Sequence, residues 1–289
     1  MFSPGVLKDR VILITGGGTG IGREMCNKFA SLGARIAILG RREDVLRKAA
    51  DELTAAGYEG FWTRCDVRNP DDVTAAVNAV FDHYGRIDVL VNNAAGNFVA
   101  PSEKLSPHAV DSVLGIVLHG TIYMTLEVGK RWIRNHQKGV VLNIVTTYSW
   151  TGSAFVVPSA AAKAGVLAVT RSLAVEWARY GIRHVAIAPG PFPTEATKRN
   201  LYPLEGMADL LKERVPLGRF GNMNEITDLA SYLVSDYASF ITGEVVTIDG
   251  GEWLKGAGEF SDLLALNDEQ WEIIRDMTRK KHDVTPEKS

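Results

Sequence analysis

The feature that most constrains the fold of this 289-residue chain is a regular alternation of short apolar runs with helix-length stretches. The runs are VILIT (11–15), RIAIL (35–39), GFWTRC (60–65), IDVLVNN (87–93), VVLNIV (140–145), HVAIA (184–188) and VVTID (245–249). Most of them lack strict polar alternation, which predicts strands buried on both faces. Stretches at 43–56, 70–84 and 106–134 have helix length. The alternation therefore predicts an α/β fold with a doubly wound parallel sheet.

The domain organisation is simple. No Pro/Gly/Ser-rich linker, internal repeat or low-complexity tract divides the chain. We predict one domain over residues 1–251, followed by a C-terminal extension over 252–289 that packs on or near the substrate site. The last stretch, RKKHDVTPEKS, should be frayed.

Composition excludes several classes of function. A net charge of −2 gives no electrostatic footprint for nucleic acid or an acidic membrane surface. Cys26 and Cys65 are too few for a disulfide framework, and the six histidines show no metal-ligand spacing. No apolar run approaches about 18 residues, and no signal or transit peptide is seen. We therefore expect a cytoplasmic protein with no membrane span and no metal.

A glycine-rich turn follows the first predicted strand. TGGGTGIGREM (15–25) has the spacing G-x-x-x-G-x-G over Gly16, Gly20 and Gly22. Glycines allow a tight turn and a close approach to a pyrophosphate, which also meets the amide donors of the helix that follows. The alternative is a tight strand–helix turn without a ligand. The position at the first strand–helix junction favours a dinucleotide site. We expect its contacts from Gly16, Gly18, Thr19, Gly20 and Ile21.

The second strand ends in LGRRED (39–44), where an acidic residue would bind the ribose of NAD. Gly40, Arg41 and Arg42 stand there instead. A guanidinium suits a 2′-phosphate, so NADPH is the predicted cofactor and Arg41 its predicted contact. The alternative is a solvated helix start, which basic residues would oppose through the helix dipole.

Further cofactor contacts are expected where later strands end, because open α/β sheets bind ligands at that edge. CDV (65–67) would bring Asp66 and Val67 near the adenine, and NNAAG (92–96) would bring Asn93 to the cleft. PGPFPTE (189–195) could present backbone groups to a nicotinamide amide. The residues expected from that motif are Pro189, Gly190, Pro191 and Phe192.

The stretch from Pro158 to Tyr180 is apolar nearly all round. Such a helix is buried on more than one side. Packing on another subunit would bury the outer side, which favours a homo-oligomer. Cover by the C-terminal extension is the alternative.

Together TGGGTGIG, NNAAG, the helix bearing Lys163, PGP and DGG (249–251) resemble the short-chain dehydrogenase/reductase family. The resemblance covers essentially the whole chain and implies a Rossmann-like fold. Most members carry a catalytic serine and the motif Y-x-x-x-K. Here Ser159 stands at the tyrosine position and Thr146 at the serine position, and Val117 replaces a common asparagine. Ordinary ketone reduction is therefore not expected.

A narrower resemblance accounts for these departures. GNFVAPSEKLSP (96–107), TTYSWTGSAFVVPSAAAKAG (146–165), LAVEWARYGIR (173–183) and GEFSDLLALNDEQW (258–271) are similar to the mitochondrial-type 2,4-dienoyl-CoA reductases. Their motifs place a tyrosine fifteen residues before the lysine, a serine four before it and an asparagine in the GNF segment. These match Tyr148, Ser159 and Asn97. The resemblance implies NADPH-dependent reduction of 2,4-dienoyl-CoA to 3-enoyl-CoA in β-oxidation of unsaturated fatty acids, and a tetramer.

That chemistry would need hydrogen-bond donors aimed at a thioester oxygen rather than an acid beside a ketone. Tyr148 and Asn97 would donate there, and Lys163 would hold the nicotinamide ribose. A core phenol, a turn residue and a solvated lysine are their structural alternatives, and Ser159 could be only a polar first-turn residue.

Cations should ring the cleft of a coenzyme A enzyme. Arg41, Arg68 and Arg199 are candidates, although Asn200 occupies the position aligned with the third. Phe98 and Ser106 match acyl-CoA contacts of the subfamily. Two other functions stay open: a 2-enoyl or 3-oxoacyl thioester reductase, and a catalytically silent NADPH-binding protein.

Overall fold

A computed structural model describes residue 3, residues 5–195 and residues 206–282. Seven strands form one parallel sheet in the order β3-β2-β1-β4-β5-β6-β7. They are β1 (Val11–Thr15), β2 (Arg35–Gly40), β3 (Gly60–Arg64), β4 (Val89–Asn92), β5 (Gly139–Ile144), β6 (Ile182–Pro189) and β7 (Val245–Ile248). The predicted α/β class and doubly wound sheet are confirmed.

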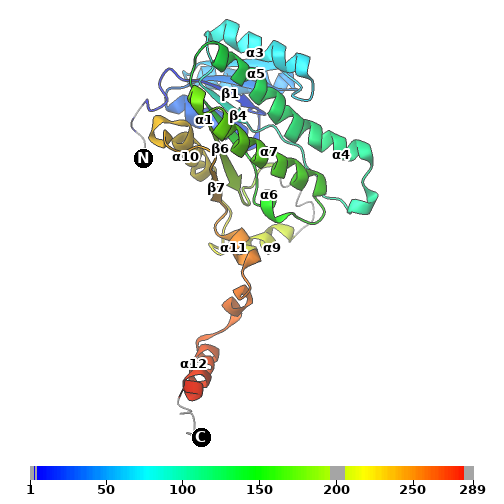
Figure 1. The fold of residues 1–289 in the computed structure, drawn as a ribbon, viewed down its shortest axis with the longest axis vertical. Helices are drawn as coiled ribbons and strands as arrows, with labels where there is room; N and C mark the ends of the chain where they lie inside the picture. The colour runs from blue at the N-terminus through cyan, green and yellow to red at the C-terminus, as the bar shows by residue number, and fades with distance from the viewer. Residues whose placement is uncertain (1–2, 4, 196–205, 283–289) are drawn as a thin grey trace.

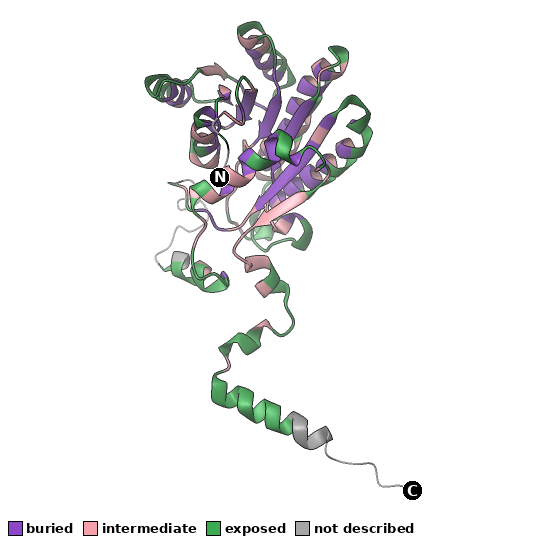
Figure 2. Ribbon diagram, turned by 90° about the vertical axis from the view of Figure 1, so that its left-hand side faces the viewer, coloured by how far each residue is buried: buried purple, intermediate pink, exposed green. Residues whose placement is uncertain are grey.

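The sheet lies between two layers of helices (Figures 1 and 2); its five middle strands are largely buried, and the edge strands β3 and β7 are only partly buried. One face is covered by α1 (Gly20–Ser31), α2 (Glu43–Ala55) and α10 (Met223–Val234). The other face is covered by α3 (Pro70–Tyr84), α5 (Gly120–Arg134) and α7 (Val157–Glu176). Trp132 and Phe29, one from each layer, are among the largest fully buried side chains. Each layer supplies an apolar helix stripe to a sheet that is apolar on both faces, which is why the strands show no polar alternation.

The predicted helix over 106–134 is nearly continuous but has a local irregularity. α4 (Pro107–Leu114) and α5 are joined by one π-helical turn, Gly115–His119. Val117 of this turn lies in the core, where it is 1% exposed, and its carbonyl accepts from Thr121 Oγ1 at 2.7 Å. Pro107–Arg134 is long and apolar enough to span a membrane by length and composition. In this fold Met124, Val128 and Trp132 of the segment pack into the core of the α/β domain.

Polar side chains form one buried chain between β4, β5 and the helices over them. Asn92 Nδ2 donates to Thr125 Oγ1 and to Asn143 Oδ1, each at 2.9 Å. Asn143 Nδ2 donates to Thr170 Oγ1 at 2.8 Å. This polar chain therefore ties α5 and α7 to the centre of the sheet.

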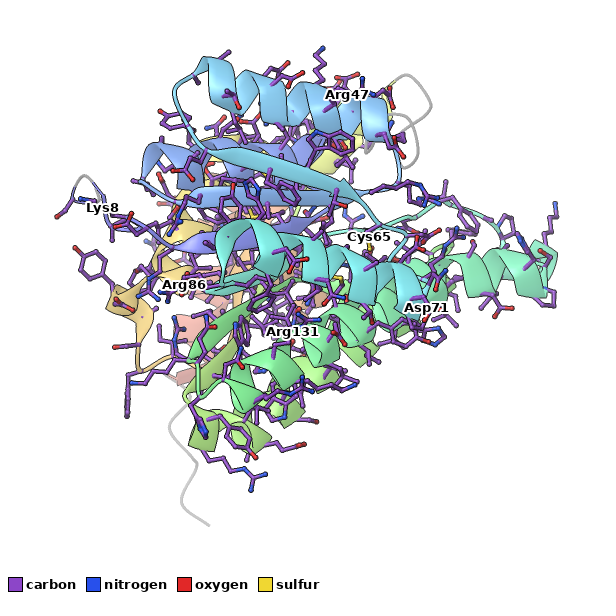
Figure 3. The ribbon with its side chains drawn as sticks, turned by 90° about the horizontal axis from the view of Figure 1, so that it is seen from above. Lys8, Arg47, Cys65, Asp71, Arg86 and Arg131 are labelled. Atoms are coloured by element: carbon purple, nitrogen blue, oxygen red, sulfur yellow. The ribbon has the colours of Figure 1, made fainter. Side chains whose placement is uncertain are left out.

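The carboxyl ends of the strands meet at one edge of the sheet. Figure 3 shows Cys65, just after β3, at this end with Asp71 at the start of α3, whereas Lys8 and Arg86 lie toward the other end. The strand order reverses between β1 and β4, so this edge has the switch point at which doubly wound sheets bind ligands.

The C-terminal extension follows β7 and leaves the domain. Its first helix, α11 (Glu252–Ala257), lies close to the domain, but residues 258–277 extend away from it (Figure 1). α12 (Asp268–His282) exposes the apolar side chains of Trp271, Ile273 and Met277. That the extension packs on or near the substrate site stays a prediction. In a single chain, the apolar side chains beyond α11 have no surface to cover them.

Candidate active site

The glycine-rich turn joins β1 to α1 at the switch point. Gly16 and Gly20 have φ angles of +68° and +55°, which side chains rarely adopt. A Cβ on Gly22 would lie 2.4 Å from Asn93 Nδ2, so the turn and strand β4 can only meet through glycine. Asn93 Nδ2 in turn donates to the carbonyl of Thr15 at 3.0 Å. The turn is thus held in place from outside by Asn93, and the amide of Gly16 donates to the carbonyl of Leu39 at 2.7 Å.

The start of α1 suits an anion. Thr19 is the N-cap, its side chain makes no cap hydrogen bond, and the first turn has no acidic residue. The helix dipole and the first amide groups therefore face a cavity, and no carboxylate in the first turn of the helix competes with a bound anion.

That cavity has a volume of about 470 Å³, within the range of small-molecule sites. Its walls contain most of the predicted cofactor contacts, namely Gly16, Gly18, Thr19, Gly20, Ile21, Arg41, Asp66, Val67 and Asn93. Thr194 and Ile116 also line it and were not among the predicted contacts. Thr194 lies in the PGPFPTE motif, so that motif could have predicted it as a cofactor contact. Ile116 lies in the π-helical turn and belongs to no motif.

Arg41 and Arg42 are both exposed at the mouth of this cavity. Arg68 pairs with Asp66, with Nη2 to Oδ2 at 2.5 Å, and this hydrogen bond lowers the pKa of the Asp66 carboxyl. Arg41 contributes more weakly to the same lowering through its charge. The described part of the cleft therefore offers Arg41 and Arg42 for a phosphate, while Arg68 already has a carboxylate partner.

The PGPF residues lie beside this cavity rather than among its walls. Pro191 and Phe192 line a smaller cavity of about 100 Å³ together with Ile248 and Gly250. A Cβ on Gly190 would lie 2.5 Å from Asp249 Cβ, so the motif packs tightly against the end of β7. Pro189 ends β6.

The tyrosine cluster is brought together by one loop and the two helices α6 and α7. Tyr148 begins the short helix α6 (Tyr148–Thr151), and Asn97 lies in the segment after β4. Asn97 Nδ2 donates to Tyr148 Oη at 3.4 Å, and Tyr148 Oη lies 3.0 Å from Ser159 Oγ. Asn97 Oδ1 accepts from the amide of Phe98 at 2.9 Å, which turns the amide's NH₂ group toward the phenol. Residues far apart in the sequence thus form one cluster, as their shared resemblance implied.

Thr146 has a local role. Its Oγ1 accepts from the amide of Tyr148 at 3.2 Å, and its carbonyl accepts from the amide of Ser149 at 3.0 Å. The residue at the family's serine position therefore holds the turn that carries Tyr148.

Lys163 is buried and only 7% exposed, so it is not a solvated helix lysine. Its Nζ donates to the carbonyl of Ile144 at the end of β5. Burial lowers the pKa of its ammonium group to about 8. An ammonium held at the end of β5, on the helix that also carries Ser159, has the position needed for a ligand hydroxyl or an oxyanion.

The predicted substrate contacts have different environments. Phe98 is partly buried against the cluster of Val113, Val117 and Ala162. Ser106 is exposed and caps α4, its Oγ accepting from the amide of Ala109 at 3.1 Å. Arg199, like Asn200, lies outside the described residues. Among the described residues, no group of three or more His, Cys, Asp or Glu side chains could hold a metal ion.

Comparison with known proteins identifies the family. Residues 16–252 match the family model described as enoyl-(acyl carrier protein) reductase, one of the short-chain reductase models. The chain belongs to the short-chain dehydrogenase/reductase family. Members are oxidoreductases that use NAD or NADP, which agrees with the cavity at the glycine-rich turn.

Two curated relatives carry more specific names. A Bacillus subtilis protein named probable 2,4-dienoyl-CoA reductase [(2E)-enoyl-CoA-producing] is 42% identical over 86% of this chain and 98% of its own length. An Arabidopsis thaliana protein named peroxisomal 2,4-dienoyl-CoA reductase [(3E)-enoyl-CoA-producing] is 40% identical over 88% of this chain and 87% of its own.

Solved structures agree with the family's fold. A short-chain dehydrogenase from Bacillus anthracis is 45% identical, with a TM-score of 0.75 over 84% of this chain and 96% of that one. A gluconate 5-dehydrogenase from Burkholderia cenocepacia, in complex with NADP and tartrate, is 31% identical. Its TM-score is 0.82 over 87% of this chain and 98% of that one.

Proposed function

We propose that this short-chain reductase uses NADPH to reduce 2,4-dienoyl-CoA to 3-enoyl-CoA in β-oxidation of unsaturated fatty acids. The observation that carries the proposal is the contact of Tyr148 Oη with both Asn97 Nδ2 and Ser159 Oγ. The names of the relatives from Bacillus subtilis and Arabidopsis thaliana support it.

The described residues fit NADPH. The uncapped start of α1 suits the pyrophosphate, and the exposed guanidinium of Arg41 suits a 2′-phosphate. Lys163 would donate to the ribose hydroxyls beside the nicotinamide. When bound, NADPH supplies a hydride.

Tyr148 and Asn97 would stabilise the charge that develops on the substrate. Hydride addition at the carbon four bonds from the thioester carbonyl carbon leaves a dienolate, whose negative charge rests largely on the thioester oxygen. Asn97 Nδ2 donates to the phenol oxygen, and Ser159 Oγ, 3.0 Å away, can also act as a donor to it, so the O–H of Tyr148 would donate to the thioester oxygen when substrate binds. Donors aimed at a developing oxyanion are worth about 10²–10³ in turnover each. A ketone reductase would instead need an acid at the position of Ser159, whose hydroxyl is far weaker than a phenol as an acid.

The carbon that receives the proton decides the product. Protonation next to the carbonyl carbon gives a 3-enoyl thioester, and protonation two carbons further gives a 2-enoyl thioester. The named relatives include both product types. We propose the 3-enoyl product, because the dienolate site resembles that of the mitochondrial-type reductases.

The experiment is NADPH oxidation with 2,4-hexadienoyl-CoA, crotonoyl-CoA and acetoacetyl-CoA in parallel, with the product of the first identified by NMR. Turnover of the dienoyl substrate to 3-hexenoyl-CoA supports the proposal. Preference for crotonoyl-CoA or acetoacetyl-CoA would favour another thioester reductase. NADPH binding without turnover of any of the three would favour a catalytically silent protein.

We also propose that the chain forms a homo-oligomer, a tetramer by the family resemblance. The outer faces of α5 and α7 form an apolar groove lined by Ile122, Leu126, Ala168, Val169, Ser172 and Leu173. The described part of the extension leaves the domain elsewhere (Figure 1) and does not cover this groove. A second copy would bury it. Cytoplasmic location stays a prediction.

A further inference from the structure

Tyr148 stands on a helix that cannot hold its own position. α6 has four residues, and an isolated helix is marginal in water below about 12 residues. Thr146 Oγ1 accepts from the amide of Tyr148 at the start of α6, and the residue after its end is Gly152 with a φ of +71°. α6 also carries Trp150, which is 36% exposed. Something other than α6 itself must fix the direction of the phenol.

Trp150 contacts a residue of the C-terminal extension. Its ring meets that of Trp253 edge to face, with 5.7 Å between the centroids and an interplanar angle of 83°. Edge-to-face pairs have a preferred geometry, so the contact fixes orientation as well as covering apolar area. Trp253 lies 105 residues after Tyr148 and belongs to α11.

α11 is anchored on two sides. The carboxylate of Asp249 accepts from the amides of Gly251 and Trp253, each at 2.9 Å, which ties the helix to the end of β7. Lys255 Nζ donates to the carbonyl of Glu213 at 2.6 Å. That residue belongs to α9 (Met207–Arg214). Trp253 is therefore held in place against the domain, unlike the mostly exposed residues 258–277 that follow α11.

We propose that Trp253 is a positioning residue: through Trp150 it holds α6 so that the Tyr148 phenol stays against Asn97 and Ser159. This inference rests on the proposed function, because it assigns the phenol a catalytic contact. It gives α11 a role that the rest of the extension does not share.

The first test is a double-mutant cycle. Trp253→Ala should lower the single-turnover rate with 2,4-hexadienoyl-CoA about three- to tenfold, the range expected for loss of one edge-to-face pair. Trp253→Phe keeps an aromatic ring and should restore most of the rate. In a Tyr148→Phe background, Trp253→Ala should cause no further loss, because the hydroxyl through which it acts is gone. An equal loss in both backgrounds would overturn the proposal.

The same variants separate positioning from substrate binding. A tryptophan pair near the mouth of the site could instead contact the acyl chain. Trp253→Ala would then raise KM, more for longer dienoyl chains, with kcat unchanged, and that result would overturn the proposal. Positioning predicts a lower kcat at every chain length and an unchanged NADPH dissociation constant.

A measurement that needs no turnover distinguishes this inference from the proposed function. Hydrogen exchange of the amides in 148–151 should be faster in Trp253→Ala than in wild type, and close to wild type in Trp253→Phe. Unchanged exchange would overturn the inference even if the enzyme reduces dienoyl-CoA. Faster exchange in a protein with no dienoyl turnover would support the positioning role of Trp253 and count against the proposed function. If Trp253→Ala does not fold, Trp150→Ala removes the same pair from the α6 side.

Discussion

Replacing Tyr148 by phenylalanine removes one hydroxyl and keeps the ring. The hydroxyl lies 3.0 Å from Ser159 Oγ and 3.4 Å from Asn97 Nδ2, so its loss affects both contacts. Two effects have to be separated. Stability should fall by about 1 kcal/mol, because Ser159 is only 2% exposed and loses a partner. Turnover should fall by about 10²–10³, or about 3–4 kcal/mol of barrier, because an oxyanion donor is lost.

The assay is single-turnover NADPH oxidation with 2,4-hexadienoyl-CoA, combined with NADPH dissociation constants and thermal unfolding. Cofactor affinity should barely change, since the phenol is assigned to the thioester. A loss of affinity parallel to the loss of rate would place Tyr148 on the cofactor instead.

Tyr84→Phe is the matched control. Tyr84 Oη donates to the carbonyl of Ile36 at 3.2 Å, near the start of β2 and so away from the strand ends that form the site. It should lose similar stability and keep full turnover. If Tyr148→Phe stays within about threefold of wild type, or matches the Tyr84 control, the oxyanion role is refuted, since a donor is worth far more.

Four further predictions follow from the described residues. Arg41→Ala should remove most of the preference for NADPH over NADH, and equal dissociation constants in the wild type would contradict the assignment. Burial lowers the pKa of Lys163 to about 8, and ribose binding favours its charged form, so NADPH affinity should be constant below that pH and weaken above it. Lys163→Met should bind NADPH more weakly and lose this pH dependence, as measured by titration at each pH. Burial lowers the pKa of His184 to about 4, so the unfolded state binds the proton more readily between about 6.5 and 4. The free energy of unfolding should therefore decrease by up to about 3 kcal/mol as the pH is lowered from about 6.5 to about 4. His184→Leu should reduce this pH dependence in acid denaturation. Val169→Glu should split the proposed oligomer in sedimentation experiments, whereas Arg171→Glu on the same helix should not.

The sequence predicted the sheet closely because buried parallel strands leave a plain signal. Every predicted apolar run became a strand, and the bounds differ by at most two residues. The glycine-rich turn was equally predictable, since the positive φ angles of Gly16 and Gly20 can hardly be met by other residues. Short stretches of sequence are enough to predict the strands and the glycine-rich turn, because both depend on local backbone sterics and on the order of elements along the chain.

Other features depend on contacts that no local pattern carries. A π-helical turn needs one extra residue within an otherwise normal helical periodicity, so 106–134 looked uniform. The pairing of Trp150 with Trp253 joins two segments without a shared motif. The cluster of Tyr148, Asn97 and Ser159 was predicted only through a resemblance, because spacing alone does not tell a catalytic phenol from a core one.

The polar chain from Thr125 through Asn92 and Asn143 to Thr170 has a consequence for folding. β4 and β5 are otherwise apolar, and hydrophobic burial alone would accept several alignments of two such strands. A slip of one residue would turn each amide toward the opposite, apolar layer and leave it without a partner, at about 1–3 kcal/mol for each buried group. In the native alignment Asn92 Nδ2 and both polar atoms of the Asn143 side chain have partners, although Asn92 Oδ1 has none, and the partners on α5 and α7 are present only once those helices have docked. Middle strands and covering helices should therefore become ordered in one cooperative step, which fixes the strand ends where the ligand site forms.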